Sequence, residues 1–276
     1  MDYFDLNDGN RIPEIGFGTY PLKGRNGAFA ISTAINNGYR MIDSACRYEN
    51  EGTVGAAIRM SGHPRGGLFI TSKLPGRHHH YREAITQIQE SLFTAGLDYF
   101  DLYLIHWPNP LEDHYVEAWQ ALIDAQKFGL VRSIGVSNFE PEHIDRLIAE
   151  TGVTPAVNQV ELHPYWSSQA VRKYNADHQI LTQAWSPLMR AGAAFKEPII
   201  QQLAQKYGKS PAQIILRWEI QLRVVPIPKA SQSAHQLSNI DIFDFVLSPE
   251  EVKAISALDK KDGRNPKYDP HSHQEF

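Results

Sequence analysis

Residues 99–137 read YFDLYLIHWPNPLEDHYVEAWQALIDAQKFGLVRSIGVS, and they hold one complete repeat of the pattern that decides the fold. An apolar run at 99–106 is followed by a helical pattern at 116–128 and then by a second apolar run at 131–137. A strand, a crossover helix and a second strand in this order are typical of parallel pairing. The stretch therefore predicts a parallel sheet that is covered by helices.

The same alternation runs along most of the chain. Short apolar runs, rich in the residues of strands buried on both faces, lie at 15–18, 39–43, 68–73, 99–106, 131–137, 157–161, 180–185 and 224–226. Helical patterns lie between most of them, as at 82–95 and 141–149, and Ser-Pro cap signals begin two more at Ser210 and Ser248. This order predicts an α/β fold, a closed (β/α)8 TIM barrel, with a doubly wound sheet as the alternative.

The two ends of the chain lie outside this alternation. Residues 3–6 and 11–12 flank an Asp-Gly turn signal, which predicts an N-terminal β-hairpin. From Asp259 onward the chain has two prolines and no periodicity, so we expect a loop-like C-terminal tail on the surface. No linker or low-complexity tract divides the sequence, and we therefore expect one domain over residues 1–276.

Composition excludes several classes of protein. The 276 residues include 27 Lys and Arg against 31 Asp and Glu, a net charge of −4, and 42% are hydrophobic. This balance is that of a soluble globular protein and argues against a nucleic-acid binder, which usually carries a basic face. One cysteine cannot form an internal disulfide, and residues 1–5 lack the features of a signal peptide. No apolar run approaches the ~18 residues of a membrane span, so we expect a cytoplasmic protein without a membrane partner.

Polar residues follow the apolar runs at the positions where a barrel carries its chemistry. The carboxyl ends of the strands converge on one mouth in such a fold. Asp43, Lys73 and His106 end three successive runs, and Tyr48 follows Asp43 in the next loop. We therefore expect these four side chains to meet at the mouth of the barrel.

The four groups suit one kind of chemistry. Asp43 should keep Lys73 charged, and Lys73 should lower the pKa of the Tyr48 phenol from its ordinary value of about 10. His106 can donate a hydrogen bond to a substrate oxygen. The set favours protonation of an oxygen on which negative charge develops, as in carbonyl reduction. No Ser-His-Asp or Cys-His arrangement for acyl transfer is apparent in the sequence.

Three ordered motifs resemble the signatures of the aldo-keto reductases. The first is GYRMIDSACRYENE at 38–51, the second is IGVSNF at 134–139, and the third begins with IPK at 227–229. The stretches YLIHWP at 103–108 and NQVELHP at 158–164 also match. The resemblance implies a (β/α)8 barrel that reduces aldehydes or ketones with a nicotinamide cofactor. QAWSPL, which ends at Leu188, resembles the short bacterial 2,5-diketo-D-gluconic acid reductases within the family.

The resemblance also implies roles for individual residues. Tyr48 would be the general acid, Lys73 and Asp43 would tune it, and His106 would orient the carbonyl. NADPH is the implied cofactor, bound by Ser137, Asn138, Gln159, Trp185, Ser186, Leu188, Lys229, His235 and Asn239. Tyr20, Trp107 and His106 are expected to contact a small carbonyl substrate, and no metal site is expected.

Two departures from common motifs bear on cofactor and metal binding. The sequence has no Gly-x-Gly-x-x-Gly that opens a helix, and loops at 186–192 and 229–239 are expected to hold the phosphates instead. The family usually has Ser or Thr and then Arg where Ala230 and His235 stand, so we expect a reduced preference for NADPH over NADH. The consecutive histidines at 78–80 are interpreted as a solvated loop, because no acidic partner for a metal is evident.

Two other functions remain open at this point. A cofactor-binding regulatory subunit, like the potassium-channel β-subunits of the same fold, is the main alternative. A barrel hydrolase that uses Asp43 and Glu161 has no support from the resemblance. Aldehydes, dicarbonyls or keto-sugars are the expected substrates, and a monomer is the expected state, as is common among relatives of this kind.

Overall fold

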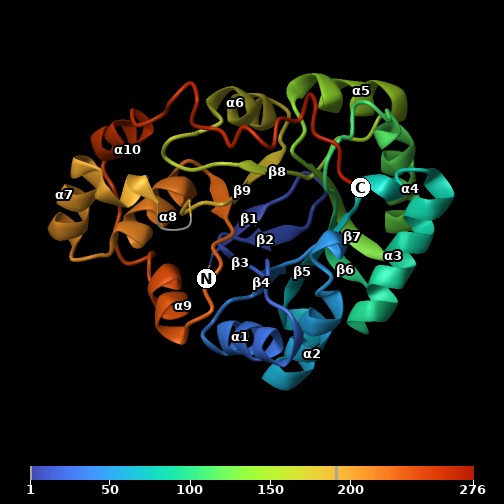
Figure 1. The fold of residues 1–276 in the computed structure, drawn as a ribbon, viewed down its shortest axis with the longest axis horizontal. Coiled ribbons are helices and arrows are strands. Elements are labelled where there is room, and N and C mark those ends of the chain that lie inside the picture. The colour runs from blue at the N-terminus through green and yellow to red at the C-terminus, as the bar shows by residue number, and fades with distance from the viewer. Residues whose placement is uncertain (1, 190–191) are drawn as a thin grey trace.

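Eight parallel strands form the centre of the computed structural model, which describes residues 2–189 and 192–276 (Figure 1). Each strand pairs with the next along the chain, so the order around the sheet follows the sequence from β3 to β10. The strands are β3 (Gly16–Gly18), β4 (Met41–Asp43), β5 (Phe69–Leu74), β6 (Phe100–Ile105), β7 (Val131–Ser137), β8 (Val157–Glu161), β9 (Leu181–Trp185) and β10 (Val224–Pro226). All eight lie within the apolar runs of the sequence or extend one residue beyond them.

A backbone hydrogen bond joins the two ends of this sheet. The Gly18 N–H in β3 donates to the carbonyl oxygen of Pro228, just after β10, at 3.0 Å. A Cβ atom at Gly18 would lie 3.1 Å from the carbonyl oxygen of Ile227, so the close approach favours glycine at this position. The sheet is therefore a nearly closed barrel. The (β/α)8 prediction is confirmed, and the doubly wound alternative is wrong.

Helices surround the strands (Figure 1). They are α1 (Gly24–Asn36), α2 (Glu51–Ser61), α3 (Tyr81–Ala95), α4 (Tyr115–Lys127), α5 (Pro141–Thr151), α6 (Gln169–Asp177), α7 (Pro198–Tyr207), α8 (Pro211–Gln221), α9 (Ser233–Ile240) and α10 (Pro249–Ser256). The two Ser-Pro signals do begin helices, because Ser210 caps α8 and Ser248 caps α10 in reciprocal capping boxes. Helices such as α3, α4, α6 and α8 pack against strands of the barrel, whereas α10 packs against α7 and α8.

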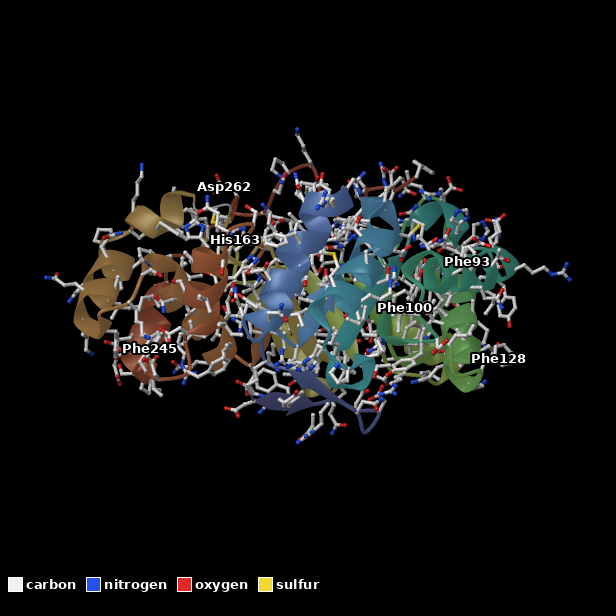
Figure 2. The ribbon with its side chains drawn as sticks, turned by 90° about the horizontal axis from the view of Figure 1, so that it is seen from below. Phe93, Phe100, Phe128, His163, Phe245 and Asp262 are labelled. Atoms are coloured by element: carbon white, nitrogen blue, oxygen red, sulfur yellow. The ribbon has the colours of Figure 1, made fainter. Side chains whose placement is uncertain are left out.

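The hairpin and the C-terminal tail lie at opposite ends of the barrel. Figure 2 shows the hairpin, β1 (Tyr3–Asp5) and β2 (Arg11–Pro13), on one side and the tail with Asp262 on the other. Phe100 lies in the core, whereas Phe93 on α3 lies on the outer surface of the helical layer. The hairpin therefore covers the amino ends of the strands, and the tail lies at the carboxyl ends.

The tail has the irregular structure that its sequence predicts, but not the predicted location. Residues 259–276 form turns and no helix or strand. Glu275, the residue before the last, is buried and only 6% exposed, although Phe276 after it is exposed. Hydrogen bonds in both directions with Asn109 hold this end inside the barrel mouth. The expectation of a surface loop is therefore wrong for Glu275, although exposed residues such as Phe276 do lie on the surface.

Among the described residues, the helices are too short or too polar to span a lipid bilayer.

Candidate active site

Lys73 and Asp43 form a buried ion pair where β5 and β4 end. The Lys73 Nζ lies 2.6 Å from Oδ1 of Asp43 and donates to the carbonyl oxygen of Ser44 at 2.8 Å. The second carboxylate oxygen of Asp43 accepts a hydrogen bond from Nε2 of Gln159 at 2.9 Å. Burial lowers the pKa of Lys73, and the nearby carboxylate of Asp43 opposes that shift. Asp43 thus supplies the charge that lets a lysine remain in the barrel interior.

Tyr48 lies beside this ion pair, on the short helical turn η1 (Cys46–Tyr48) that follows β4. Its ring centroid lies 5.1 Å from the Lys73 Nζ and 5.7 Å from the His106 ring, which meets it edge-on at 76°. Tyr20 covers another side of the phenol, with ring centroids 5.1 Å apart. The structure therefore brings together the four groups that the sequence predicts would meet.

The electrostatics at Tyr48 differ from the expectation. Burial raises the pKa of Tyr48 well above its ordinary value, and the negative charges of Asp43 and Glu275 raise it further. The expectation of a net lowering of this pKa by Lys73 is wrong, because burial and the two carboxylates outweigh the effect of the ammonium group. Asp43 lies closer to Lys73 than the phenol does, so the ion pair presents little net positive charge to the phenol.

His106 follows β6 and is held from two directions. Nδ2 of Asn138 donates to the backbone carbonyl oxygen of His106 at 3.0 Å. On the ring, Nδ1 lies 2.7 Å from Oε1 of Glu275, at the end of the C-terminal tail. Glu275 was not predicted from the sequence, because a single acidic residue in an aperiodic tail carries no signal of its position in space.

Four of the predicted cofactor residues lie together beside Asp43. Ser137 donates to the carbonyl oxygen of Gln159 at 2.9 Å, and Nδ2 of Asn138 donates to Oγ of Ser137 at 3.0 Å. The indole N–H of Trp185 donates to Oδ1 of Asn138 at 2.7 Å, which fixes a ring that is still partly exposed. An amide-rich wall with a fixed indole fits a nicotinamide, which needs carboxamide partners and a flat surface.

The other predicted cofactor residues lie farther out. Ser186 has a positive φ of 54° and is exposed, and Leu188 is partly buried, whereas Arg190 and Ala191 of the same loop lie outside the described residues. Lys229 is exposed and forms no ion pair with any residue that the structure describes. His235, exposed, and Asn239, buried, both lie on α9. A free ammonium group near the start of a helix fits an anionic phosphate.

The expected substrate residues have different exposures. Tyr20 is 55% exposed at the rim, so it can contact a ligand above Tyr48. Trp107 is 6% exposed, because the tail covers it with the rings of Tyr268 and His273 at centroid distances of 5.8 and 4.2 Å. The tail therefore forms part of the wall around the tetrad of Asp43, Tyr48, Lys73 and His106.

A separate cavity of about 610 Å³ lies on the other side of Asn138, between α6 and the tail. Trp166 and Arg264 line it, and none of Asp43, Tyr48, Lys73 or His106 does. The converging side chains, and not the cavity volume, mark the candidate active site.

The histidines at 78–80 have an acidic partner after all. His80 Nδ1 lies 3.2 Å from Oε2 of Glu117, and Nδ1 of His114 lies 3.5 Å from the same oxygen. The premise that no acidic residue accompanies these histidines is therefore wrong, because α4 brings Glu117 to them. All three side chains are substantially exposed.

A (β/α)8 barrel with Tyr, Lys, Asp and His at the carboxyl ends of its strands is the arrangement of a barrel oxidoreductase. Residues 14–260 match the model of the aldo/keto reductase family, and the chain belongs to this family. The match covers all eight strands and all four groups of the tetrad.

Individual relatives agree with this assignment. The chain is 48% identical to 2,5-diketo-D-gluconic acid reductase B of a Corynebacterium species, over 98% of this chain and 97% of the relative. It is 46% identical to the methylglyoxal reductase DkgA of Escherichia coli, over 92% of each chain. The solved structure of a Bombyx mori aldo-keto reductase in complex with NADP superposes with a TM-score of 0.90, at 35% identity and 99% coverage of both chains. These relatives are reductases, so the comparisons favour an enzyme over the regulatory-subunit alternative.

Proposed function

We propose that this chain is an NADPH-dependent reductase that converts aldehydes and ketones to alcohols. The observation that carries the proposal is the meeting of Tyr48, Lys73, Asp43 and His106 at the mouth of the barrel. Membership of the aldo/keto reductase family and the NADP-bound relative support it. We propose further that the 276 residues act as one catalytic domain.

In this proposal Tyr48 is the proton donor. A carbonyl oxygen within reach of the Tyr48 hydroxyl accepts its proton as negative charge develops on that oxygen. The high pKa of Tyr48 keeps the proton on the phenol until then. Lys73 then stabilises the phenolate that remains, and Asp43 holds Lys73 in place.

His106 has a different task. A ring N–H of the imidazole can donate to the carbonyl oxygen and orient it toward Tyr48. The same hydrogen bond strengthens as the oxygen gains negative charge, which stabilises the alkoxide. The burial of His106 strengthens this interaction, because little water competes for the oxygen.

Ser137, Asn138 and Gln159 would hold the carboxamide of a nicotinamide, and Trp185 would cover one face of the ring. A reduced nicotinamide, when bound, supplies the hydride that adds to the carbonyl carbon. The hydrogen bonds among these residues fix the wall in advance, so binding orders few additional side chains.

Cofactor preference provides the first test. Ala230 and His235 stand where the resemblance places the hydroxyl and guanidinium groups that bind the 2′-phosphate, and an imidazole lacks the planar, five-donor fork of arginine. We therefore expect NADPH to bind through Lys229, with NADH accepted at a moderately lower kcat/KM. Steady-state kinetics with both cofactors measure the ratio. A preference for NADPH above about a thousandfold, or ~4 kcal/mol, would contradict this expectation, because other groups would then have to bind the 2′-phosphate strongly.

The proposed substrates are small aldehydes, dicarbonyls and keto-sugars. The names of the two bacterial relatives support this class, and the exposed Tyr20 leaves one side of the mouth accessible. A panel that includes methylglyoxal and 2,5-diketo-D-gluconate, followed by the loss of NADPH absorbance, identifies the preferred substrate. Tight NADPH binding without reduction of any compound in the panel would overturn the proposal.

We also propose a monomeric, cytoplasmic enzyme. Cys46 is the one cysteine of the chain and is a free thiol, which fits a reducing compartment. Burial raises the pKa of Cys46 to about 11, so the thiol stays protonated and little reactive. Size-exclusion chromatography with light scattering tests the monomer directly.

A further inference from the structure

Two histidines and a glutamate converge where the neighbouring helices α3 and α4 begin (Figure 1). His80 directly precedes α3, His114 directly precedes α4, and Glu117 lies three residues after His114 in the first turn of α4. Nδ1 of His80 lies 3.2 Å from Oε2 of Glu117, and Nδ1 of His114 lies 3.5 Å from the same oxygen. The centroids of the two imidazole rings are 4.0 Å apart. One possible ligand atom of each residue lies within 4.8 Å of those of the other two, so the three groups surround one point.

Helix capping does not explain the two histidines. The residue at an N-cap position is usually Ser, Thr, Asp or Asn, whose side-chain oxygen accepts a hydrogen bond from the first turn. His80 and His114 occupy the N-cap positions of α3 and α4, and neither side chain makes a capping hydrogen bond in these two described helices. Their Nδ1 atoms lie near the Glu117 carboxylate instead. The two imidazoles are therefore placed to bind something other than the backbone.

The carboxylate of Glu117 is oriented by a second partner. Its Oε1 accepts a hydrogen bond from the Tyr81 N–H at 2.8 Å, which holds Oε2 on the side of the histidines. Hydrogen bonds of this kind orient the carboxylates that bind metals in proteins. Glu117 thus offers one oxygen to the shared point and anchors the other on the backbone of α3.

We propose that His80, His114 and Glu117 form a binding site for a divalent cation of the Zn²⁺ class. Zn²⁺ takes imidazole nitrogen and carboxylate oxygen at about 2.0–2.2 Å in tetrahedral geometry, which places neighbouring ligand atoms about 3.3–3.6 Å apart. The separations of 3.2 and 3.5 Å match this spacing, and the partly exposed side chains can adjust by small rotations. Three protein ligands leave the fourth position to water. The ion would tie the loop after β5 to the start of α4.

A second cluster of the same composition lacks a necessary feature. Glu142, His143 and His271 also lie close enough to share an ion. Nδ1 of His143, however, accepts a hydrogen bond from the Glu140 N–H at 3.2 Å in the capping box of α5. A neutral imidazole has one acceptor nitrogen, so Nε2 of His143 carries the proton and offers no lone pair to a metal. This cluster therefore serves as a control.

The position of the proposed site determines its affinity and selectivity. The positive ends of two helix dipoles lie beside it and oppose a cation, so we expect affinity in the micromolar range. Mg²⁺ prefers oxygen ligands and should bind much more weakly than Zn²⁺. In the part of the chain that the structure describes, no ion pair joins these three side chains to Asp43, Tyr48, Lys73 or His106. The inference therefore does not depend on the proposed reductase function.

The test is a titration of the metal-free full-length protein with ZnCl₂, followed by isothermal titration calorimetry. We expect one Zn²⁺ per chain for the wild type. His114→Ser and Glu117→Gln should each weaken this binding at least about tenfold, because each removes or neutralises a ligand. Serine is a favoured N-cap residue, and glutamine can still accept from the Tyr81 N–H, so both variants retain the helix starts.

His271→Ser is the matched control. It removes an exposed histidine from the second cluster and should leave Zn²⁺ affinity unchanged. A wild type that binds no Zn²⁺ up to about 1 mM would overturn the proposal. So would wild-type affinity in both His114→Ser and Glu117→Gln, which would assign the ion to other histidines. An equal loss in His271→Ser and His114→Ser, or Mg²⁺ binding as strong as that of Zn²⁺, would also overturn it.

Thermal denaturation gives a second measurement. An ion that binds the folded chain raises the temperature of unfolding by mass action. With Zn²⁺ about 100-fold above its dissociation constant, we expect the wild-type midpoint to rise by a few degrees and the His114→Ser midpoint to stay unchanged. Equal shifts in the two proteins would show that the ion acts elsewhere and would contradict the proposed site.

Discussion

The pKa of Tyr48 shows that a buried ion pair acts on a neighbouring group differently from its lysine alone. Lys73 alone beside Tyr48 would favour the phenolate, as the sequence suggests. Asp43 lies 2.6 Å from the Lys73 Nζ, whereas the Tyr48 ring centroid lies 5.1 Å away. Burial then dominates and raises the pKa of Tyr48. Tyr48 is thus better described as a firmly held proton donor than as a partly ionised one.

This difference predicts the pH dependence of the reaction. A general acid is active while it holds its proton, and a raised pKa moves the loss of that proton to higher pH. We therefore expect kcat/KM for carbonyl reduction to show no Tyr48-dependent decrease below pH 10, the ordinary value for tyrosine. The measurement is a pH profile of kcat/KM for the wild type and for Tyr48→Phe. An alkaline limb below about pH 9 that is present in the first and absent in the second would contradict the expectation.

The buried ion pair also predicts a large effect on stability. Lys73→Met removes the ammonium group and leaves the carboxylate of Asp43 buried with Gln159 as its remaining donor. Breaking one side of a buried pair costs about 3–5 kcal/mol of unfolding free energy. Urea denaturation measures the change. Lys173→Met is the control, since the Lys173–Asp177 pair on α6 has the same 2.6 Å separation but is exposed, and should change stability little.

Among the elements, strands were predicted well and the end of the tail was not. Strands such as β7 are buried on both faces, so their apolar runs mark them directly in the sequence. Glu275 contacts Asn109 and Gly76, which lie 166 and 199 residues away along the chain. No local pattern encodes such contacts, because they exist only once the barrel has brought the loops after β5 and β6 together. The position of Glu275 in the barrel mouth therefore becomes apparent only in the folded structure.

Closure of the barrel predicts that a substitution at Gly18 lowers the stability of the fold. Gly18→Ala would place a Cβ 3.1 Å from the Ile227 carbonyl oxygen, at the hydrogen bond that joins β3 to the segment after β10. We expect the free energy of unfolding to fall by about 1–3 kcal/mol, because a crowded backbone contact must open. Thermal or urea denaturation measures this loss. Gly66→Ala is the matched control, since a Cβ there meets no atom within 4 Å, and an equal loss in both variants would contradict the packing argument.

At the scale of the whole molecule, the fold was predictable because the alternation of strands and helices repeats along the chain. The members of the tetrad were predictable for the same reason, since a barrel collects the carboxyl ends of its strands at one mouth. Their charges were not, because the pKa of Tyr48 depends on distances to Asp43 and Glu275 that only the folded chain defines. The family match over residues 14–260 agrees with the fold, and the substrate depends on the loops and the tail around the mouth.

The central claim is that Tyr48 donates the proton in an NADPH-dependent carbonyl reduction. The most direct measurement compares the rate of NADPH consumption with methylglyoxal for the wild type and Tyr48→Phe, with NADPH binding followed in parallel. We predict a fall in kcat of roughly 100- to 10,000-fold, with NADPH affinity unchanged, because phenylalanine fills the same space without a proton to give. A Tyr48→Phe enzyme that binds NADPH and turns over at close to the wild-type rate would contradict the account.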